Sequence, residues 1–514
     1  MTAVVAARRP MSRVSAPVAA GLALPRWFWV VAVVGVAGIA FFVRVRLLIQ
    51  TGGLDGADGY DDGVYYAAAD ALVHGRLPYR DFLLLQPPGT IVALAPFAWF
   101  GSITHDPYGV VAARLCFIGI GALNACLAMA IVRRFGLVAS ALAGIGYAVY
   151  FPAAFTERST LLEPLGTCGL LVAVLLADRA WRRPQVGMML AGAAAGVAIG
   201  MRIWYVVPVA LIAAFHWRSA LRFLAGVAIT ASAIYLPFLI GSPANMVRQV
   251  VLDQLGRPRD TAHSPFKRAS TYLGATNLHL SEPWSALLSV HKVGLGLLLG
   301  VIVCAAVALT VRGARLFPVT GIVTGVVLLV SPSFFLHYAA LSAPWVVLTV
   351  AVGVSRMLRA VRSRRVRALL AMVLLAALVT LNLREVQLSR PSSPIPAAAL
   401  RPAAQQVAGC VVSDDPQILA ALDVLSRDLS HHCTVWPDVT GYTYDRDSVR
   451  VAGHVVVRKQ NAAWQADVTH YLLSGEAVVI HRSATELDAA STRSVDSGRV
   501  LARSGSWTLH AVTH

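Results

Sequence analysis

A polar segment at 49–89 gathers acids, tyrosines and glycines between two apolar runs. Its aspartates are Asp55, Asp58, Asp61, Asp62, Asp70 and Asp81. A single carboxylate held near an acceptor alcohol can act as a general base, because the alcohol is a poor nucleophile until it loses its proton. Asp61 and Asp62 also stand just before a helical pattern at 64–74. Acids in that position are stabilised by free N–H groups and the helix dipole, so a capping role is the alternative.

One essential acid suits group transfer from an activated donor. When the leaving group is a phosphate, it needs cations or hydrogen-bond donors to hold its charge, but no general acid. Hydrolysis of a glycosidic bond would instead need two opposed carboxyl groups. We therefore expect one catalytic acid accompanied by a few basic and tyrosyl side chains.

Three short motifs in this segment resemble the first periplasmic loop of the GT-C glycosyltransferases. They are Asp61-Asp62-Gly63-Val64-Tyr65, Pro78-Tyr79-Arg80-Asp81-Phe82 and Gln86-Pro87-Pro88-Gly89. The likeness is greatest to the protein O-mannosyltransferase and lipid A aminoarabinose transferase superfamily, in its actinobacterial form. The resemblance implies that Asp61 is the base, with Asp62 and Tyr65 in the places of the family's Glu and Tyr. Beyond this loop it rests on hydropathy and topology.

The resemblance also implies substrate-binding residues elsewhere. Glu163-Pro164 is similar to an acid at the top of the fourth span, and His337-Tyr338 to a basic-aromatic pair near the lipid phosphate. Simpler explanations remain open, since Glu163 could cap the following span and Tyr338 could anchor at the interface. A titratable group such as His337 is unusual at that depth, and Arg202 must be paired or line a wet cavity.

Two positions depart from the family pattern. Many relatives have Glu-Lys before the Pro-Pro pair, where this chain has Leu85 and Gln86. The Glu has been linked to a metal and the Lys to the donor phosphate. A divalent metal is therefore in doubt, no metal ligand or cofactor is predicted, and Gln86 is kept among the donor-binding candidates. Cationic candidates for the phosphate are Arg44, Arg202, Arg248, Arg257, Arg259, Lys267 and Arg268. For Arg257 and Arg259, contact with lipid headgroups is the favoured interpretation.

The composition places most of the chain in a lipid bilayer. Hydrophobic residues make up 57% of the 514 positions and charged residues 14%, with a mean hydropathy of +0.65. Apolar runs of about 20 residues, the length that crosses the hydrocarbon core, recur up to about residue 385. The net charge of +18 does not indicate nucleic-acid binding, because the arginines fall in small clusters between apolar runs.

Arginine placement predicts a mainly α polytopic bundle of about eleven spans. They cover 27–48, 109–132, 137–155, 165–178, 186–201, 203–217, 222–240, 290–311, 317–333, 339–355 and 368–384. The shorter apolar piece at 90–101 is expected not to cross, because the basic clusters between spans then share the cytoplasmic side. The N-terminal tail, 1–26, is expected to be cytoplasmic, and 27–388 to form a catalytic module in the cell membrane with its first outer loop at 49–89.

Residues 389–514 are expected to form a small extracytoplasmic α/β domain. Val411-Val412 reads as a strand, 417–428 and 461–473 as helices, and 477–480 and 507–512 as strands. Outside the cell Cys410 and Cys433 could form a disulfide. Asp414, Asp415, His431 and His432 could suggest a metal cluster, but an N-cap and solvated loop residues are the favoured interpretation.

The sequence therefore predicts an inverting transferase that uses a polyprenyl-phosphate sugar donor and has its site on the outer face. Excess of arginine over lysine suggests a high-GC, actinobacterium-like source, for which the resemblance implies mannose first and arabinofuranose second. The acceptor could be a glycan, a lipoglycan or a protein hydroxyl. Two alternatives remain: a transporter or flippase of lipid-linked glycans, which would place charges near the bilayer midplane, and a non-catalytic cell-envelope assembly protein.

Overall fold

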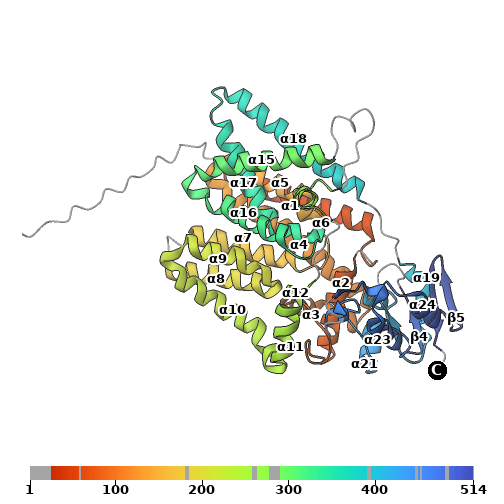
Figure 1. The fold of residues 1–514 in the computed structure, drawn as a ribbon. Coiled ribbons are helices and arrows are strands. Elements are labelled where there is room, and N and C mark those ends of the chain that lie inside the picture. Colours follow the sequence, from red (N-terminus) through yellow and green to blue (C-terminus); the bar gives the residue numbers. More distant parts are fainter. Residues whose placement is uncertain are drawn as a thin grey trace, which may run out of the picture.

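The fold is taken from a computed structural model of the chain (Figure 1). It describes residues 25–56, 59–179, 184–257, 263–276, 290–389, 395–445, 450–451, 454–480 and 486–512. Most of the predicted N-terminal tail lies outside the described residues, as do Asp58, Arg182, Arg183 and Arg259.

Helices make up the part of the chain before residue 390. They are α1 (Arg26–Thr51), α2 (Tyr60–Val73), α3 (Gly89–Ser102), α4 (Asp106–Val132), α5 (Leu137–Val149), α6 (Phe151–Glu157), α7 (Glu163–Arg179), α8 (Pro184–Met201), α9 (Val206–Phe215), α10 (Ala220–Gly241), α11 (Pro243–Val247), α12 (Asp253–Leu255), α13 (Pro265–Tyr272), α15 (Val290–Leu309), α16 (Leu316–Val330), α17 (Ala343–Leu358) and α18 (Arg364–Leu388). A short 3-10 helix, η6 (Leu336–Leu341), precedes α17.

Several of these helices are long and apolar enough to cross a bilayer. Within the described residues six pass by length and composition, and the bent pair α5–α6 makes a seventh if it counts as one span. Shorter apolar helices include α3, α8, α9 and α17. The chain is thus a mainly helical, multi-pass membrane protein, while the count of eleven spans stays a prediction.

Helix α3 forms the shorter apolar piece that was expected not to cross. Its 14 residues extend only about 21 Å, less than the hydrocarbon thickness. A side chain at Gly89 would collide with Gly200 at the end of α8, and one at Gly101 would collide with the Tyr66 hydroxyl beside Asp106 at the start of α4. Helix α3 therefore packs between the end of α8 and the start of α4, and its not crossing the bilayer stays a prediction.

The predicted span 137–155 is broken where Pro152 enters the chain. Helices α5 and α6 meet at Tyr150 with a bend of 52°. Proline lacks the N–H that would bond to the carbonyl four residues earlier. That carbonyl, of Ala148, instead accepts a hydrogen bond from Arg44 Nη1 at 3.0 Å, and Asn382 Oδ1 accepts from the N–H of Phe151 at 2.8 Å.

Basic clusters from distant loops meet at the other end of the bundle. Arg134 Nη2 donates to the carbonyl of Gly313 at 2.7 Å and pairs with Asp178 at 3.0 Å. Arg359 bonds to the carbonyl of Phe135. The loops after α4, α15 and α17 and the last turn of α7 therefore lie side by side, as the arginine pattern predicted.

The C-terminal region, residues 395–512, contains a four-stranded sheet of order β1-β4-β6-β5. The strands are β1 (Val411–Ser413), β4 (Ala477–Val479), β5 (Val500–Ser504) and β6 (Trp507–Ala511); β1 and β4 are parallel and the other pairs antiparallel. A separate pair is β2 (Arg450–Val451) with β3 (His454–Val455). Helices are α19 (Ala397–Gln405), α20 (Pro416–Ala421), α21 (Leu425–Ser430), α22 (Tyr442–Asp445), α23 (Ala462–Leu472) and α24 (Ala489–Asp496).

The predicted helix 417–428 is two helices. Asp423 has a φ of 60°, in the left-handed region that ends a helix, and it separates α20 from α21. Asp415 caps α20 by accepting a hydrogen bond from the N–H of Gln417 at 3.0 Å, so the capping interpretation is confirmed for this residue. Strand β5 was not predicted, because its residues do not alternate clearly between apolar and polar.

The C-terminal region packs directly on α2, beside α3 (Figure 1). Gln417 Nε2 donates to the carbonyl of Gly56 at 2.7 Å. A side chain at Gly63 would meet the Gln417 Cβ at 2.5 Å, so only glycine allows this approach. The Ser426 hydroxyl lies between two buried carboxyl groups, 2.8 Å from Asp70 and 2.5 Å from Asp106. This contact joins α2, α4 and α21.

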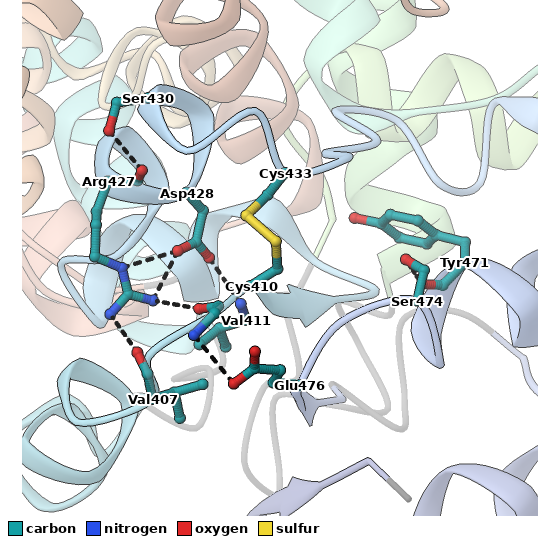
Figure 2. Close-up of a disulfide and its surroundings, with 11 residues drawn as sticks. Val407, Cys410, Val411, Arg427, Asp428, Ser430, Cys433, Tyr471, Ser474 and Glu476 are labelled. Carbon is teal, nitrogen blue, oxygen red and sulfur yellow. Dashed lines mark hydrogen bonds and ion pairs between the residues drawn. A yellow bond between two sulfur atoms is a disulfide. The ribbon is translucent and has the colours of Figure 1, made fainter. Parts of the chain in front are cut away.

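A disulfide between Cys410 and Cys433 ties the start of β1 to the segment after α21 (Figure 2). Beside it, Asp428 accepts hydrogen bonds from Arg427 at 2.7 Å and from the N–H of Val411 at 2.9 Å. The charged pair and the covalent bond therefore hold the same junction together.

Candidate active site

Helix α2 positions the two acids of the first motif. It begins at Tyr60, earlier than the predicted residue 64, because Gly59 with an extended backbone takes the N-cap position. Asp61 and Asp62 lie in the first turn, and neither side chain caps the helix. The expectation that they precede the helix, or cap it, is therefore wrong. Successive helical side chains point about 100° apart, so the two acids face different surroundings.

Asp62 is held in a buried ion pair. Its Oδ2 accepts hydrogen bonds from Arg114 Nη2 at 2.5 Å and from the Ser159 hydroxyl at 2.6 Å. Arg114 also donates to the carbonyls of Leu54 and Gly56, at 2.8 and 2.7 Å. A carboxylate engaged in this way fixes the start of α2 to α4 and orients its neighbour.

Asp61 stays accessible. Its side chain is 44% exposed, and its Oδ2 lies 3.9 Å from His337 Nε2. Partial removal from bulk water, with repulsion from Asp438, raises the pKa of Asp61 to about 7, and the positive charge of Arg257 opposes this rise. A carboxylate with that pKa can take and release a proton near neutral pH.

His337 is kept neutral by its surroundings. Burial lowers its pKa well below the ordinary value, and the positive charges of Arg202 and Arg257 lower it further. The ring stacks on Phe335 at 5.5 Å and meets Tyr338 edge-on at 4.9 Å. A neutral imidazole fixed between aromatic rings can donate a hydrogen bond without adding charge.

Arg202 joins two predicted residues in one cluster. It forms a buried ion pair with Glu163, and its guanidinium lies 4.0 Å over the ring of Tyr338. The hydroxyl of Tyr205 donates to the Glu163 carbonyl at 3.2 Å. Asp61, His337, Tyr338, Arg202 and Glu163 therefore form a continuous series of contacts at one end of the bundle.

Tyr65 and Gln86 occupy different places. Tyr65 is buried on α2, where burial and the charge of Asp61 raise its pKa. Gln86 is partly exposed, and its carbonyl accepts a hydrogen bond from the Tyr79 hydroxyl at 2.7 Å. Tyr79 has a φ of 67° in a tight turn where its N–H bonds to the Phe82 carbonyl at 2.9 Å. The second motif thus shapes the loop that leads to Gln86.

Two of the cations predicted to bind phosphate, Arg44 and Arg257, lie in different surroundings. Arg44 is fully buried and pairs at 2.5 Å with Glu157, which Asn124 and Tyr147 also contact at 2.7 and 2.9 Å. This buried pair was not predicted, although an arginine and a glutamate within apolar runs signal one. The positive charge of Arg257 lowers the pKa of Asp61, and its contact with lipid headgroups stays a prediction.

The residues do not fit the metal linked to some relatives. Leu85 is an apolar, buried side chain in the place of their Glu. Within the described part of the chain, His, Cys, Asp and Glu form no group of three that could hold a metal ion. No step below depends on a metal.

Sequence reasoning missed Asp438 of the C-terminal region. Its carboxylate accepts a hydrogen bond from the Tyr60 hydroxyl at 3.3 Å, one residue before Asp61. Of the neighbouring charges, it affects the pKa of Asp61 most. The only local signal is an acid in a Trp-Pro-Asp-Val-Thr-Gly turn at 436–441.

Comparisons with known proteins identify the fold. No protein-family model and no curated protein sequence matches the chain. ArnT from Cupriavidus metallidurans, bound to undecaprenyl phosphate, superimposes with a TM-score of 0.57 and 15% identity over 95% of this chain and 99% of that one. Its apo state gives 0.59 and 15% identity over 95% and 98%. The chain shares the fold of ArnT.

A second solved structure supports the same likeness to the ArnT fold. The Archaeoglobus fulgidus oligosaccharyltransferase AglB, in complex with an inhibitory peptide and a dolichol-phosphate, matches with a TM-score of 0.52 and 12% identity, over 88% of this chain and 70% of that one. At these identities the likeness establishes the architecture. Whether the chain acts as a transferase has to be argued from its own residues.

Proposed function

We propose that this chain is an inverting glycosyltransferase that moves a sugar from a polyprenyl-phosphate donor to an acceptor hydroxyl, with Asp61 as general base. The observation that carries the proposal is the contrast between two adjacent acids. Asp62 is buried and paired with Arg114, whereas Asp61 is 44% exposed beside a neutral imidazole. A carboxylate that is accessible, titrates near neutrality and is held in place by its neighbour suits proton removal from an alcohol.

The transfer reaction needs a single base. Asp61 takes the acceptor proton while the acceptor oxygen bonds to the anomeric carbon. The bond from that carbon to the phosphate oxygen breaks, and the polyprenyl phosphate leaves as an anion. A single displacement inverts the anomeric centre. Arg257 and the N–H of His337 are the groups we assign to the phosphate, because the charge of Arg257 acts on both Asp61 and His337.

An apolar cavity supports a lipid-linked donor. It has a volume of about 390 Å³ and lies between α13, α15, α16 and α17, with Tyr272, Ile302 and Val346 in its lining. Isoprene units are apolar like this surface, and any water that they displace from it favours their binding. ArnT and AglB were solved with undecaprenyl phosphate and a dolichol-phosphate, respectively, which supports the same chemical class of donor here.

We infer that the site faces away from the cytoplasm. The arginine clusters gather at the opposite end of the bundle, as the positive-inside rule expects of cytoplasmic loops. The disulfide between Cys410 and Cys433 suits an oxidising compartment. Eleven spans with the C-terminal region outside remain the proposed topology. Mannose is the proposed sugar, with arabinofuranose second.

The test is transfer by the purified full chain in nanodiscs. Radiolabelled polyprenyl-phosphate mannose and polyprenyl-phosphate arabinofuranose are each incubated with cell-envelope acceptors. We expect transfer with one donor, lowered about 100- to 10,000-fold by Asp61→Asn. Asp55→Asn, an exposed acid of the same loop, is the matched control and should leave the rate unchanged. Transfer that survives Asp61→Asn would overturn the assigned base.

A further inference from the structure

Asp438 presents one carboxylate oxygen that is fully engaged. Its Oδ1 accepts hydrogen bonds from the N–H of Gly441 at 2.8 Å, from the Thr440 hydroxyl at 3.1 Å and from the Tyr60 hydroxyl at 3.3 Å. The same Tyr60 hydroxyl accepts a bond from the N–H of Thr440 at 3.0 Å. The carboxylate is therefore oriented from both the C-terminal region and α2.

The other oxygen, Oδ2, has no hydrogen-bond partner within the described residues, and Asp438 is partly exposed. Gly441 makes room for this oxygen, because a side chain there would lie 2.3 Å from it. An ionised carboxylate accepts hydrogen bonds on both oxygens. The free oxygen can therefore accept a bond from a ligand.

The turn that carries Asp438 is rigid on both sides. The ring of Trp436 stacks on Tyr442 at 4.1 Å and on Tyr471 at 4.5 Å. The backbone N–H of Trp436 donates to the Tyr471 hydroxyl at 3.1 Å. The indole N–H of Trp464 donates to the carbonyl of Val439 at 3.2 Å. A polar group fixed in this way is preorganised for binding.

Asp438 also acts on the proposed base. Its charge raises the pKa of Asp61 more than the charge of any other residue does, including that of the adjacent Asp62. Coulombic influence falls with distance and with solvent screening. Asp438 and Asp61 therefore belong to one site, although they come from different parts of the chain.

We propose that Asp438 binds a second hydroxyl of the acceptor, so that the acceptor is a sugar with hydroxyls on neighbouring carbons. This inference rests on the proposed function. Two carboxylates that share a site accept hydrogen bonds but cannot donate them. A sugar ring supplies O–H donors from adjacent carbons, one to Asp61 and one to Asp438. A serine or threonine side chain supplies a single O–H donor.

The experiment uses the full chain in nanodiscs, the radiolabelled donor and three acceptors: octyl α-mannoside, the analogue that lacks the hydroxyl next to the reacting one, and a Ser/Thr-rich peptide. With octyl mannoside, Asp438→Asn should raise the acceptor KM about 10- to 100-fold, because a bond to a charged group is lost. The donor KM should stay within about twofold. Asp488→Asn is the matched control, because Asp488 only caps α24 and asparagine is an equally good cap.

The deoxy acceptor separates a binding role from a structural one. Wild-type protein should use it about tenfold less well than octyl mannoside. Asp438→Asn should lower transfer to the deoxy acceptor no further, because the hydroxyl that Asp438 binds is already missing. A general loss of structure would lower both reactions equally. The variant should also shift the acid limb of kcat/KM to lower pH, because a negative charge beside Asp61 is gone.

Every other outcome refutes a stated part of the proposal. An unchanged acceptor KM in Asp438→Asn, or equal losses on both glycosides, refutes the binding role while transferase activity stands. Preferred transfer to the peptide refutes the sugar acceptor. If wild-type protein releases no polyprenyl phosphate with any acceptor, and Asp61→Asn changes nothing, the proposed function fails and this inference fails with it.

Discussion

The titration of Asp61 should set the pH dependence of transfer. With a pKa of about 7, the base is about 9% ionised at pH 6 and about 91% at pH 8. The kcat/KM for the acceptor should therefore rise about tenfold across that interval and level off above it. An unperturbed aspartate, ionising near pH 3.9, would give a flat profile over the same range.

The raised pKa of Asp61 also predicts how the stability of the folded chain depends on pH. Asp61 ionises near 3.8 in the unfolded chain and near 7 in the folded one. The folded state therefore binds the proton more tightly, and the stabilisation it provides is complete below pH 3.8 and lost as pH rises through 7. Asp61→Asn should have almost no effect on Tm near pH 4 and should raise it increasingly up to pH 7, with a plateau above.

The pH dependence of the rate and the pH dependence of the stability can be measured on one protein preparation. Initial rates at subsaturating acceptor give kcat/KM from pH 5.5 to 8.5, and thermal unfolding in nanodiscs gives the Tm difference between wild type and Asp61→Asn. Asp55→Asn should leave both curves in place. A flat rate profile together with a Tm difference that does not depend on pH would refute the reasoning about this carboxylate.

Three further predictions concern what holds the site. Arg114→Gln leaves Asp62 buried without its cation and should lower the free energy of unfolding by about 3–5 kcal/mol. Addition of Asp62→Asn should restore part of that loss in thermal unfolding. Cys433→Ser opens a loop whose ends are 23 residues apart and should lose about 3 kcal/mol; reductant should lower the Tm of wild type but not of this variant. If Cys410 is labelled by maleimide in unreduced wild-type protein, the bond is absent. Gly63→Val should cost about 1–3 kcal/mol by overpacking and make the C-terminal region more sensitive to protease. Unaltered proteolysis would contradict the close packing.

Local patterns predicted the mainly helical bundle correctly for a physical reason, while the role of Asp61 stays a prediction. In a bilayer the length of an apolar run and the arginines that flank it determine most of the architecture. Asp61 was found because its motif is contiguous and sits beside a span. Single residues change the backbone where the pattern gives no warning: Pro152 bends a predicted span, and Asp423 divides a predicted helix.

Contacts between distant segments could not be predicted from the sequence. The surroundings of Asp61 and Asp62 differ because Arg114, in a later helix, pairs with Asp62. Arg44 within an apolar run indicates that a buried partner exists, but the sequence does not identify Glu157 as that partner. Asp438 reaches the site only through the packing of the C-terminal region on α2, so its spacing from other acids is uninformative.

The hydrogen bond between Tyr60 and Asp438 joins residues 378 positions apart. A ribosome makes α2 well before Asp438, so a nascent chain holds the proposed base long before the group that we assign to the acceptor. Premature termination between α18 and Asp438 would therefore leave the helical bundle without the residue that we assign to the acceptor.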